Sequence, residues 1–332
     1  MARAARTKLP QPVFHEPIFG EDGSLPDPTG FSTSHGSDNA LYKQIGDLAT
    51  KDVVPIPKSR IADDKMYSLA EAYGSHGAEI VKNITAAGKI IFHSLGDSGA
   101  SNAGKYPKEL RVADQVTLDC ASSDENNRAA FLYHLGDIVY NFGEARYYYD
   151  QFYEPFRNYP APIFAIPGNH DSFILPGTKP ADAPLTTFQR NFCSTQTEIT
   201  PEAGSLHRTA MTQPGVYFTL DAPFVRIIGL FSNALEDPGV ISNLDKKKKW
   251  PVTNIQIDFL RASKNTMAPY CWRPITRRSA TRRPARATAP AAITAPAPRC
   301  CSRSIRSATR SASIRTLSCP ATPIIISATP GS

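Results

Sequence analysis

Three short motifs place oxygen and nitrogen donors directly after apolar stretches of the chain. They read Gly-Asp-Ser-Gly at residues 96–99, Gly-Asp-Ile-Val-Tyr at residues 136–140 and Gly-Asn-His-Asp at residues 168–171. The apolar run before each motif predicts a buried strand, and in open α/β sheets ligands bind at the carboxyl ends of the strands. Hard oxygen donors together with an amide suit divalent or trivalent metals rather than soft ones. The sequence therefore predicts an α/β fold with a metal site at one edge of a sheet.

The order of these motifs resembles that of a known family. Gly-Asp-x-Gly, Gly-Asp-x-x-Tyr and Gly-Asn-His-Asp are similar to the first three sequence blocks of the calcineurin-like metallophosphoesterases. The Asp-x-Gly form of the first block and the Tyr of the second are similar to the purple acid phosphatase branch. The resemblance covers about residues 88–262 and implies an α/β/β/α sandwich with its metal site at the strand ends.

The resemblance implies a role for each candidate residue. Asp137 would bridge two metal ions (Fe, Mn or Zn), Asp97 and Tyr140 would bind the first ion, and Asn169 would bind the second. A hydroxide held between the ions would attack the phosphorus of a phosphate ester, either a small molecule or a nucleotide. His170 would donate a hydrogen bond or a proton to the phosphate or the leaving-group oxygen.

Each of these residues also has a purely structural interpretation. Asp97 precedes Ser and Gly and fits a turn, Asp137 fits a helix N-cap, and Tyr140 begins an aromatic stretch that fits core packing. Taken together, the three motifs favour the metal site. His93 and His134 lie inside the apolar runs, and we expect them to be buried supporting histidines rather than ligands.

The positive charge of the chain is concentrated in its C-terminal tail. The net charge is +7, yet residues 272–332 contain eleven Arg and no Lys, Asp or Glu. Without those eleven, 26 of the 37 Lys and Arg remain against 30 Asp and Glu, so the rest of the chain carries −4. The charge is therefore no indication of a nucleic-acid surface on the body. The tail composition predicts a disordered low-complexity segment, which as a basic arm would bind acidic partners.

A second interpretation of the tail is translation in the wrong reading frame. One codon choice for residues 274–278, read from the third base, spells His-His-Pro-Pro. In the same shifted frame, residues 317–327 permit Val-Leu-Ser-Gly-His-Ala-His-His-Tyr-Gln. Both strings resemble downstream blocks of the family. The break would lie near residues 262–270, after Phe259-Leu260-Arg261, where a predicted helix is cut short.

The missing downstream blocks have a consequence for catalysis. The family completes its two-metal site with histidines after the third block, whereas the last histidine of this sequence is His207. We therefore expect impaired hydrolysis and a sandwich that is incomplete in its C-terminal half. A non-catalytic relative with a basic tail is the alternative.

The domain organisation predicted from these patterns has three parts. Residues 1–85 form an N-terminal extension with a helix at 63–83, residues 86–262 form the partial metallophosphoesterase domain, and residues 263–332 form the tail. We expect a second helix at 147–156 and a hairpin turn at 221–223. Further strands are predicted at 129–135, 162–166, 216–220 and 225–230.

The chain shows no segment that would direct it to a membrane. The N-terminal residues are not followed by the apolar region of a signal peptide, and no stretch reaches the roughly 18 apolar residues of a membrane span. We therefore expect no membrane partner and, by default, a cytoplasmic protein, although the family resemblance leaves export open.

Overall fold

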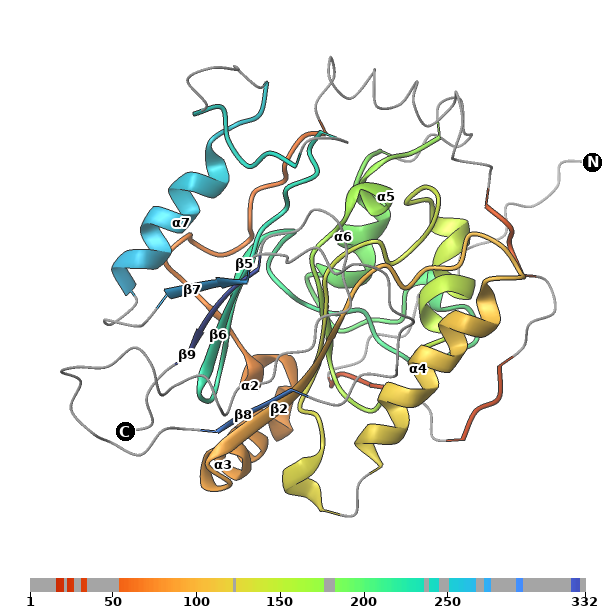
Figure 1. Cartoon of the computed structure of the whole chain (residues 1–332), viewed down its shortest axis with the longest axis horizontal. Coiled ribbons are helices and arrows are strands. Elements are labelled where there is room, and N and C mark those ends of the chain that lie inside the picture. Colours follow the sequence, from red (N-terminus) through yellow and green to blue (C-terminus); the bar gives the residue numbers. More distant parts are fainter. Residues whose placement is uncertain are drawn as a thin grey trace, which may run out of the picture.

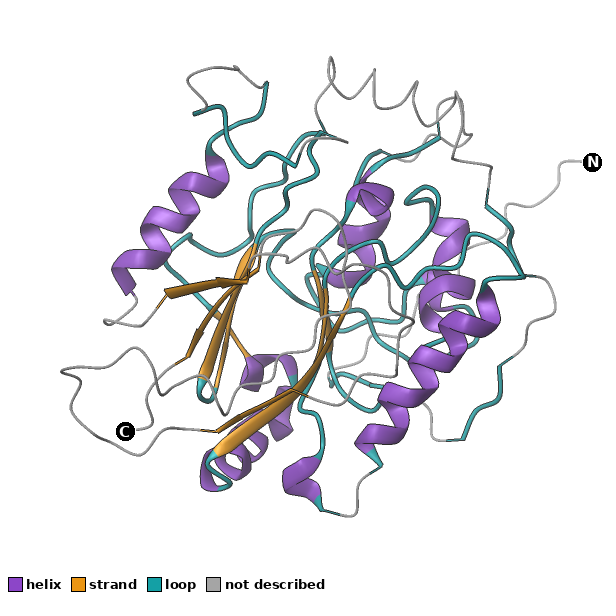
Figure 2. Cartoon of the chain, in the orientation of Figure 1, coloured by secondary structure: helices purple, strands orange, loops and turns teal. Residues whose placement is uncertain are grey.

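Two β-sheets pack face to face with helices on their outer sides (Figures 1 and 2). The computed structural model describes residues 16–20, 23–26, 31–34, 54–121, 124–175, 183–235, 239–244 and 251–266, and the backbone of strands at 272–275, 291–294 and 324–328. Helix α7 (Ile255–Thr266) lies outside one sheet and helix α4 (Tyr106–Cys120) outside the other. This arrangement confirms the predicted α/β class and is consistent with the α/β/β/α sandwich.

The first sheet contains the three strands that precede the motifs. Its order is β4-β3-β2-β8, in which β2 (Lys89–Leu95), β3 (Leu132–His134) and β4 (Ile163–Ala165) run parallel and β8 (Ala291–Thr294) lies at the edge. Strands buried on both faces read as nearly continuous apolar runs, which explains why the sequence reveals them. Because the three strands are parallel, their carboxyl ends and the motifs meet at one edge.

The second sheet is built around an antiparallel hairpin. Its order is β1-β5-β6-β9-β7, where β9 is Ile324–Ala328 and β7 is Trp272–Ile275. Strand β5 (Phe218–Ala222) pairs with β6 (Val225–Gly229), which confirms the predicted hairpin. Phe224 occupies the turn with a φ of 64°. The short β1 (Tyr67–Ser68) runs parallel to β5.

Aromatic side chains fill the space between the two sheets. Tyr133 and Phe164 of the first sheet have ring centroids 6.2 and 6.4 Å from that of Phe218 on the second sheet. Tyr67 contacts both phenylalanines edge-on. Large buried rings of this kind supply much of the apolar area that stabilises a core, so the two sheets form one folded unit.

Helix α4 is a helix that the sequence patterns did not predict. Its buried positions, Tyr106, Glu109, Ala113, Val116 and Cys120, recur every three or four residues and form one face. That face includes a glutamate and only a few large apolar residues, so its apolar period is weak. The other described α-helices are α2 (Leu69–Ala72), α3 (Gly77–Ala86), α5 (Asn169–Ser172) and α6 (Thr186–Phe192).

The predicted helix at 63–83 is broken into shorter elements. Tyr67 and Ser68 form β1, and α2 ends before Gly74, whose φ is +61°. A left-handed residue cannot continue a right-handed helix, so a new helix begins at Gly77. The predicted helix at 147–156 is a π-helical turn, η4 (Tyr149–Tyr153), with buried aromatic side chains. Short 3-10 turns are η1 (Gly74–His76), η2 (Glu125–Asn127), η3 (Ala145–Tyr147) and η5 (Pro201–Ala203).

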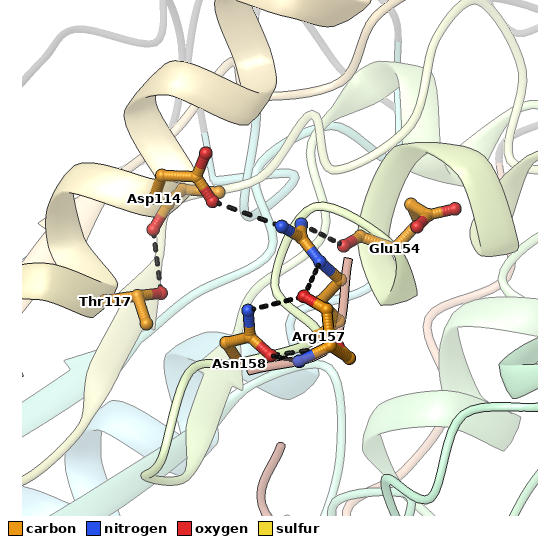
Figure 3. A network of polar contacts seen from close by, with 7 residues as sticks. Asp114, Thr117, Glu154, Arg157 and Asn158 are labelled. Carbon is orange, nitrogen blue, oxygen red and sulfur yellow. Dashed lines mark hydrogen bonds and ion pairs between the residues drawn. The ribbon is translucent and has the colours of Figure 1, made fainter. Parts of the chain in front are cut away.

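The described part of the N-terminal region makes polar contacts with the rest of the fold. Figure 3 shows the buried Arg157 next to Asp114 of α4, with their nitrogen and oxygen 3.5 Å apart. Arg157 and Asn158 both donate to the carbonyl of Ser24 at 3.0 Å, and Ser24 donates back to Asn158. Strand β1 likewise extends the second sheet. The described N-terminal residues therefore contact the rest of the fold, and the boundary at residue 85 stays a prediction.

Three short segments of the tail are strands, contrary to the expectation of disorder. β8 (Ala291–Thr294) pairs with β2, β9 (Ile324–Ala328) pairs with β6, and β7 (Trp272–Ile275) pairs with β9. The physical reason is that β2 and β6 otherwise present unpaired backbone groups, which an Ile-rich or Ala-rich segment can satisfy. Residues 263–266 complete helix α7, and the remaining tail residues lie outside the described residues.

Candidate metal centre

Two aspartates occupy strained turns at the ends of neighbouring strands. Asp97 follows β2 and Asp137 follows β3, and each has a φ of 55°. A non-glycine residue in this left-handed region costs roughly 1–3 kcal/mol, and such residues cluster at functional sites as well as in tight turns. The turns are bonded to each other, because the Asp97 N–H donates to the carbonyl of Gly136 at 3.1 Å.

A single phenol oxygen joins the two aspartates. The Tyr140 Oη lies 2.9 Å from Asp97 Oδ1 and 3.1 Å from Asp137 Oδ2. Asp137 is only 2% exposed, so its negative charge is shielded little by solvent. Two carboxylates and one phenol form a donor set that suits a hard cation. The structure thus brings together three of the four predicted metal ligands.

The third motif reaches the same place through the short helix α5. The His170 N–H donates to Asp137 Oδ1 at 3.2 Å, and the imidazole ring lies 4.2 Å from the Tyr140 ring between centroids. Asn169, the fourth predicted ligand, is the first residue of α5 and lies directly before His170. A Cβ on Gly168 would overlap Asp137 Oδ1, so only glycine permits this close approach.

The orientation of the His170 ring follows from one contact. Nδ1 lies 2.9 Å from the carbonyl oxygen of Asn141, and a carbonyl can only accept a hydrogen bond. Nδ1 therefore carries a proton, and Nε2 is the ring nitrogen whose protonation depends on the charge of the ring. Nε2 accepts a hydrogen bond when the ring is neutral and donates one when the ring is charged.

Asp171 organises the centre, although the sequence patterns gave it no role. Its carboxylate accepts four backbone N–H groups, from Asp137 at 2.7 Å, Ile138 at 2.9 Å, Val139 at 3.1 Å and Gly168 at 2.8 Å. Burial and the nearby charge of Asp137 raise the pKa of Asp171, and the backbone bonds oppose this rise. The only sequence signal was its position as the last residue of Gly-Asn-His-Asp.

His134, the last residue of β3, hydrogen-bonds to both the first and the second motif. Its Nδ1 accepts the Gly136 N–H at 3.2 Å, so its proton is on Nε2, which donates to Ser98 Oγ at 2.8 Å. Burial lowers the pKa of His134 to about 3 and keeps it neutral. His93 is buried elsewhere, with Nδ1 3.0 Å from the Tyr159 hydroxyl. Both histidines are buried, as expected.

The donor set is oxygen-rich and contains no histidine ligand. Among the described residues, no group of three or more His, Cys, Asp or Glu side chains could hold a metal ion. Asp97, Asp137 and Tyr140 fit a first ion, whereas a second ion would have only Asp137 and Asn169.

No helix in the described part of the chain is long and apolar enough to cross a membrane.

Comparisons with known proteins agree with the motifs. A family model described as calcineurin-like phosphoesterase matches residues 92–277, which include all the predicted site residues and span more than half of the chain. A search of the curated proteins and a search of the solved structures each found no match. The domain is therefore of a kind that hydrolyses phosphate esters, and the chain belongs to the calcineurin-like phosphoesterase family.

Proposed function

We propose that the centre binds metal ions and hydrolyses phosphate esters of small molecules or nucleotides. The observation that supports this most directly is the contact of one phenol, Tyr140, with two carboxylates, Asp97 and Asp137. These acids come from separate strained turns. Backbone strain lowers stability, and it is expected where a binding site requires a particular backbone conformation. The family match supports the reaction class.

The ligands in this proposal are Asp97, Asp137, Tyr140 and Asn169, which would hold up to two ions of Fe, Mn or Zn. Such ions, when bound, activate water near neutral pH and neutralise phosphoryl charge. The chain itself holds Asp137 between the other donors through the Asp171 carboxylate. The Tyr140 phenol favours the purple acid phosphatase branch, in which it would bind ferric iron.

His170 is the proposed proton donor to the leaving group. Its Nδ1–H donates to the Asn141 carbonyl, and in this proposal Nε2 faces the substrate. That carbonyl also stabilises the charged ring, because it accepts from the cationic form more strongly. A charged His170 would donate its Nε2 proton to the departing oxygen.

We further propose that this chain is impaired because its C-terminal part is read in a shifted frame. The last histidine is His207, so residues 208–332 cannot supply the downstream histidine ligands. Helix α7 ends at Thr266, within the proposed break at 262–270. Sequencing the coding DNA across codons 255–332 tests the shift, and an intact frame there would contradict it.

The test of function compares the present chain with a frame-corrected chain. We expect metal-dependent hydrolysis of an aryl phosphate by the corrected chain with Mn²⁺ or Fe/Zn, and a much lower rate for the present chain. Asp137→Asn should abolish the activity, whereas Asp114→Asn, a half-exposed acid on α4, should leave it unchanged. No metal-dependent hydrolysis by either chain would overturn the proposal, and two tightly bound ions in the present chain would contradict the impairment.

A second candidate function rests on the charge of the tail. Residues 272–332 carry eleven Arg and no acidic residue, so they would attract acidic partners such as nucleic acid. Replacing Arg277, Arg278, Arg282 and Arg283 with Gln, outside the described strands, should weaken salt-sensitive DNA binding in a mobility-shift assay. Unchanged binding would reject this function.

A further inference from the structure

Three buried glutamines in the described chain make the same pair of hydrogen bonds. In each pair the side-chain amide accepts the N–H of one residue and donates to the carbonyl of that same residue. Gln151 holds Tyr140 at 2.7 and 2.6 Å, Gln213 holds Ala165 at 3.0 and 2.7 Å, and Gln256 holds Phe231 at 2.8 and 2.6 Å. Each of these glutamines is fully buried. Such a pair fixes both peptide groups that flank one Cα.

Gln151 differs from the other two in the residue that it holds. Tyr140 presents its phenol to Asp97 and Asp137, whereas Ala165 and Phe231 present no polar side chain. Because the direction of a Cα–Cβ bond follows from the backbone, fixing both peptide groups of Tyr140 limits where its phenol can point. The pair of bonds therefore acts on the position of a proposed ligand.

The surroundings of Gln151 leave this amide little freedom. A Cβ on Gly99 would lie 2.7 Å from Gln151 Oε1, so the turn that carries Asp97 packs directly on the amide. On the other side, the preceding residue Asp150 accepts the backbone N–H of Ser32 at 2.8 Å. The first motif thus packs on Gln151 itself, and an N-terminal segment bonds to the residue before it.

We propose that Gln151 is a positioning residue that sets the Tyr140 phenol against the two aspartates. It does not belong to any of the three motifs, and it acts through Tyr140 rather than by touching a substrate or an ion. The proposal rests on the proposed function, because it assigns Tyr140 as a ligand. The amide is needed as such, since only a group that both donates and accepts can satisfy both backbone atoms.

The first test measures the binding of Mn²⁺ to the full chain by isothermal titration calorimetry. Gln151→Met keeps the side-chain length but removes both bonds, and Gln151→Glu removes only the donor. We expect about a 10–100-fold weaker Kd for both variants, as is usual when a partner of a metal ligand is lost. Gln256→Met is the matched control, because it loses an equally buried pair of bonds on Phe231, and its Kd should stay within about twofold of the unmodified chain. An unchanged Kd in both Gln151 variants, or an equal loss in the control, would overturn the proposal.

The second test needs no metal and uses chain labelled with ¹³C at the tyrosine Cζ. Tyr140→Phe assigns the Tyr140 signal, whose chemical shift reports the hydrogen bonds of the phenol. We expect Gln151→Met to move this signal toward the value of a solvated phenol and Gln256→Met to leave it in place. A Tyr140 signal unmoved by Gln151→Met would overturn the positioning role. If the unmodified chain fails to bind Mn²⁺, that result agrees with the proposed impairment of this chain, and the Cζ signal still decides the role of Gln151.

Discussion

The carboxylate of Asp171 accepts the backbone N–H of Asp137 at 2.7 Å, so these two buried acids are neighbours at the carboxyl end of the first sheet. The Asp137 carboxylate contacts the Tyr140 phenol, whereas the Asp171 carboxylate accepts hydrogen bonds from four backbone N–H groups. The two residues therefore have different roles. Asp137 presents carboxylate oxygens to a bound ion, and Asp171 stabilises the turn that carries Asp137.

Asp171→Asn should destabilise the protein. The substitution keeps the size of the side chain but replaces one oxygen with an NH₂ group, which would face backbone donors without accepting from them. An unsatisfied buried donor costs about 1–3 kcal/mol, and two N–H groups contact each oxygen of Asp171. We expect a loss of about 2–5 kcal/mol in the free energy of unfolding, measured with denaturant. The exposed Asp258→Asn is the control, and a loss below about 1 kcal/mol for Asp171→Asn would contradict this role.

Gly168→Ala should disrupt the centre more than an ordinary glycine substitution. The new Cβ would overlap Asp137 Oδ1 and lie 2.6 Å from the Asp137 nitrogen, so the second and third motifs would have to separate. We expect loss of metal binding and a lower melting temperature. Gly104→Ala is the matched control, because its Cβ would meet only Asn102 Oδ1, at 3.3 Å. Equal behaviour of the two variants in calorimetry would refute the close-approach argument.

Tyr140→Phe should remove the colour expected of the purple acid phosphatase branch. If the phenol binds ferric iron, adding Fe³⁺ to the chain should produce a visible absorption band that requires the Tyr140 oxygen. Tyr149→Phe, at a half-buried tyrosine of η4, should keep the band. A band that persists in Tyr140→Phe would show that another residue binds the iron.

The stability of the fold should fall as the pH drops from about 6.5 to about 4. Burial lowers the pKa of His93 from 6.5 to about 4, and the charge of Asp119 opposes this shift. Since the unfolded chain binds the proton more readily in this window, acid favours unfolding, and the stability is recovered above pH 6.5. The full contribution is about 3 kcal/mol. His93 is then neutral at pH 7, so its 3.7 Å approach to Asp119 is not an ion pair there.

The measurement is the free energy of unfolding at several pH values for the unmodified chain and for His93→Gln. The variant should show a shallower dependence between pH 4 and 6.5. His134 contributes in the same direction, because burial lowers its pKa to about 3, so some slope should remain. An identical slope in the two proteins would show that His93 is not buried in its neutral form.

Removing residues 267–332 should lower the soluble yield of the chain. β8 covers the edge of β2 and β9 covers the edge of β6, and exposed edges invite pairing between molecules. Light scattering of the purified chain, with and without these residues, measures the effect. A truncated chain that stays monomeric at high concentration would show that the tail strands are dispensable.

Local patterns in the sequence determined the strands of the first sheet, the β5–β6 hairpin and the places of Asp97, Asp137, Tyr140, Asn169 and His170. They could do so because buried strands and tight turns depend on a few neighbouring residues. The patterns missed α4, whose buried face has a weak apolar period, and they overran Gly74, where a positive φ ends the helix.

Only the tertiary structure decided how these residues meet. The contact of one phenol with two carboxylates joins residues up to 43 positions apart, and the bond between Asp171 and Asp137 spans 34 positions. Gln151 lies in η4 and belongs to no motif, and its importance follows only from its hydrogen bonds to the backbone of Tyr140. Such contacts depend on the parallel order of β2, β3 and β4, which brings three separate turns to one edge. No single stretch of sequence contains that order, because it arises from packing between distant segments.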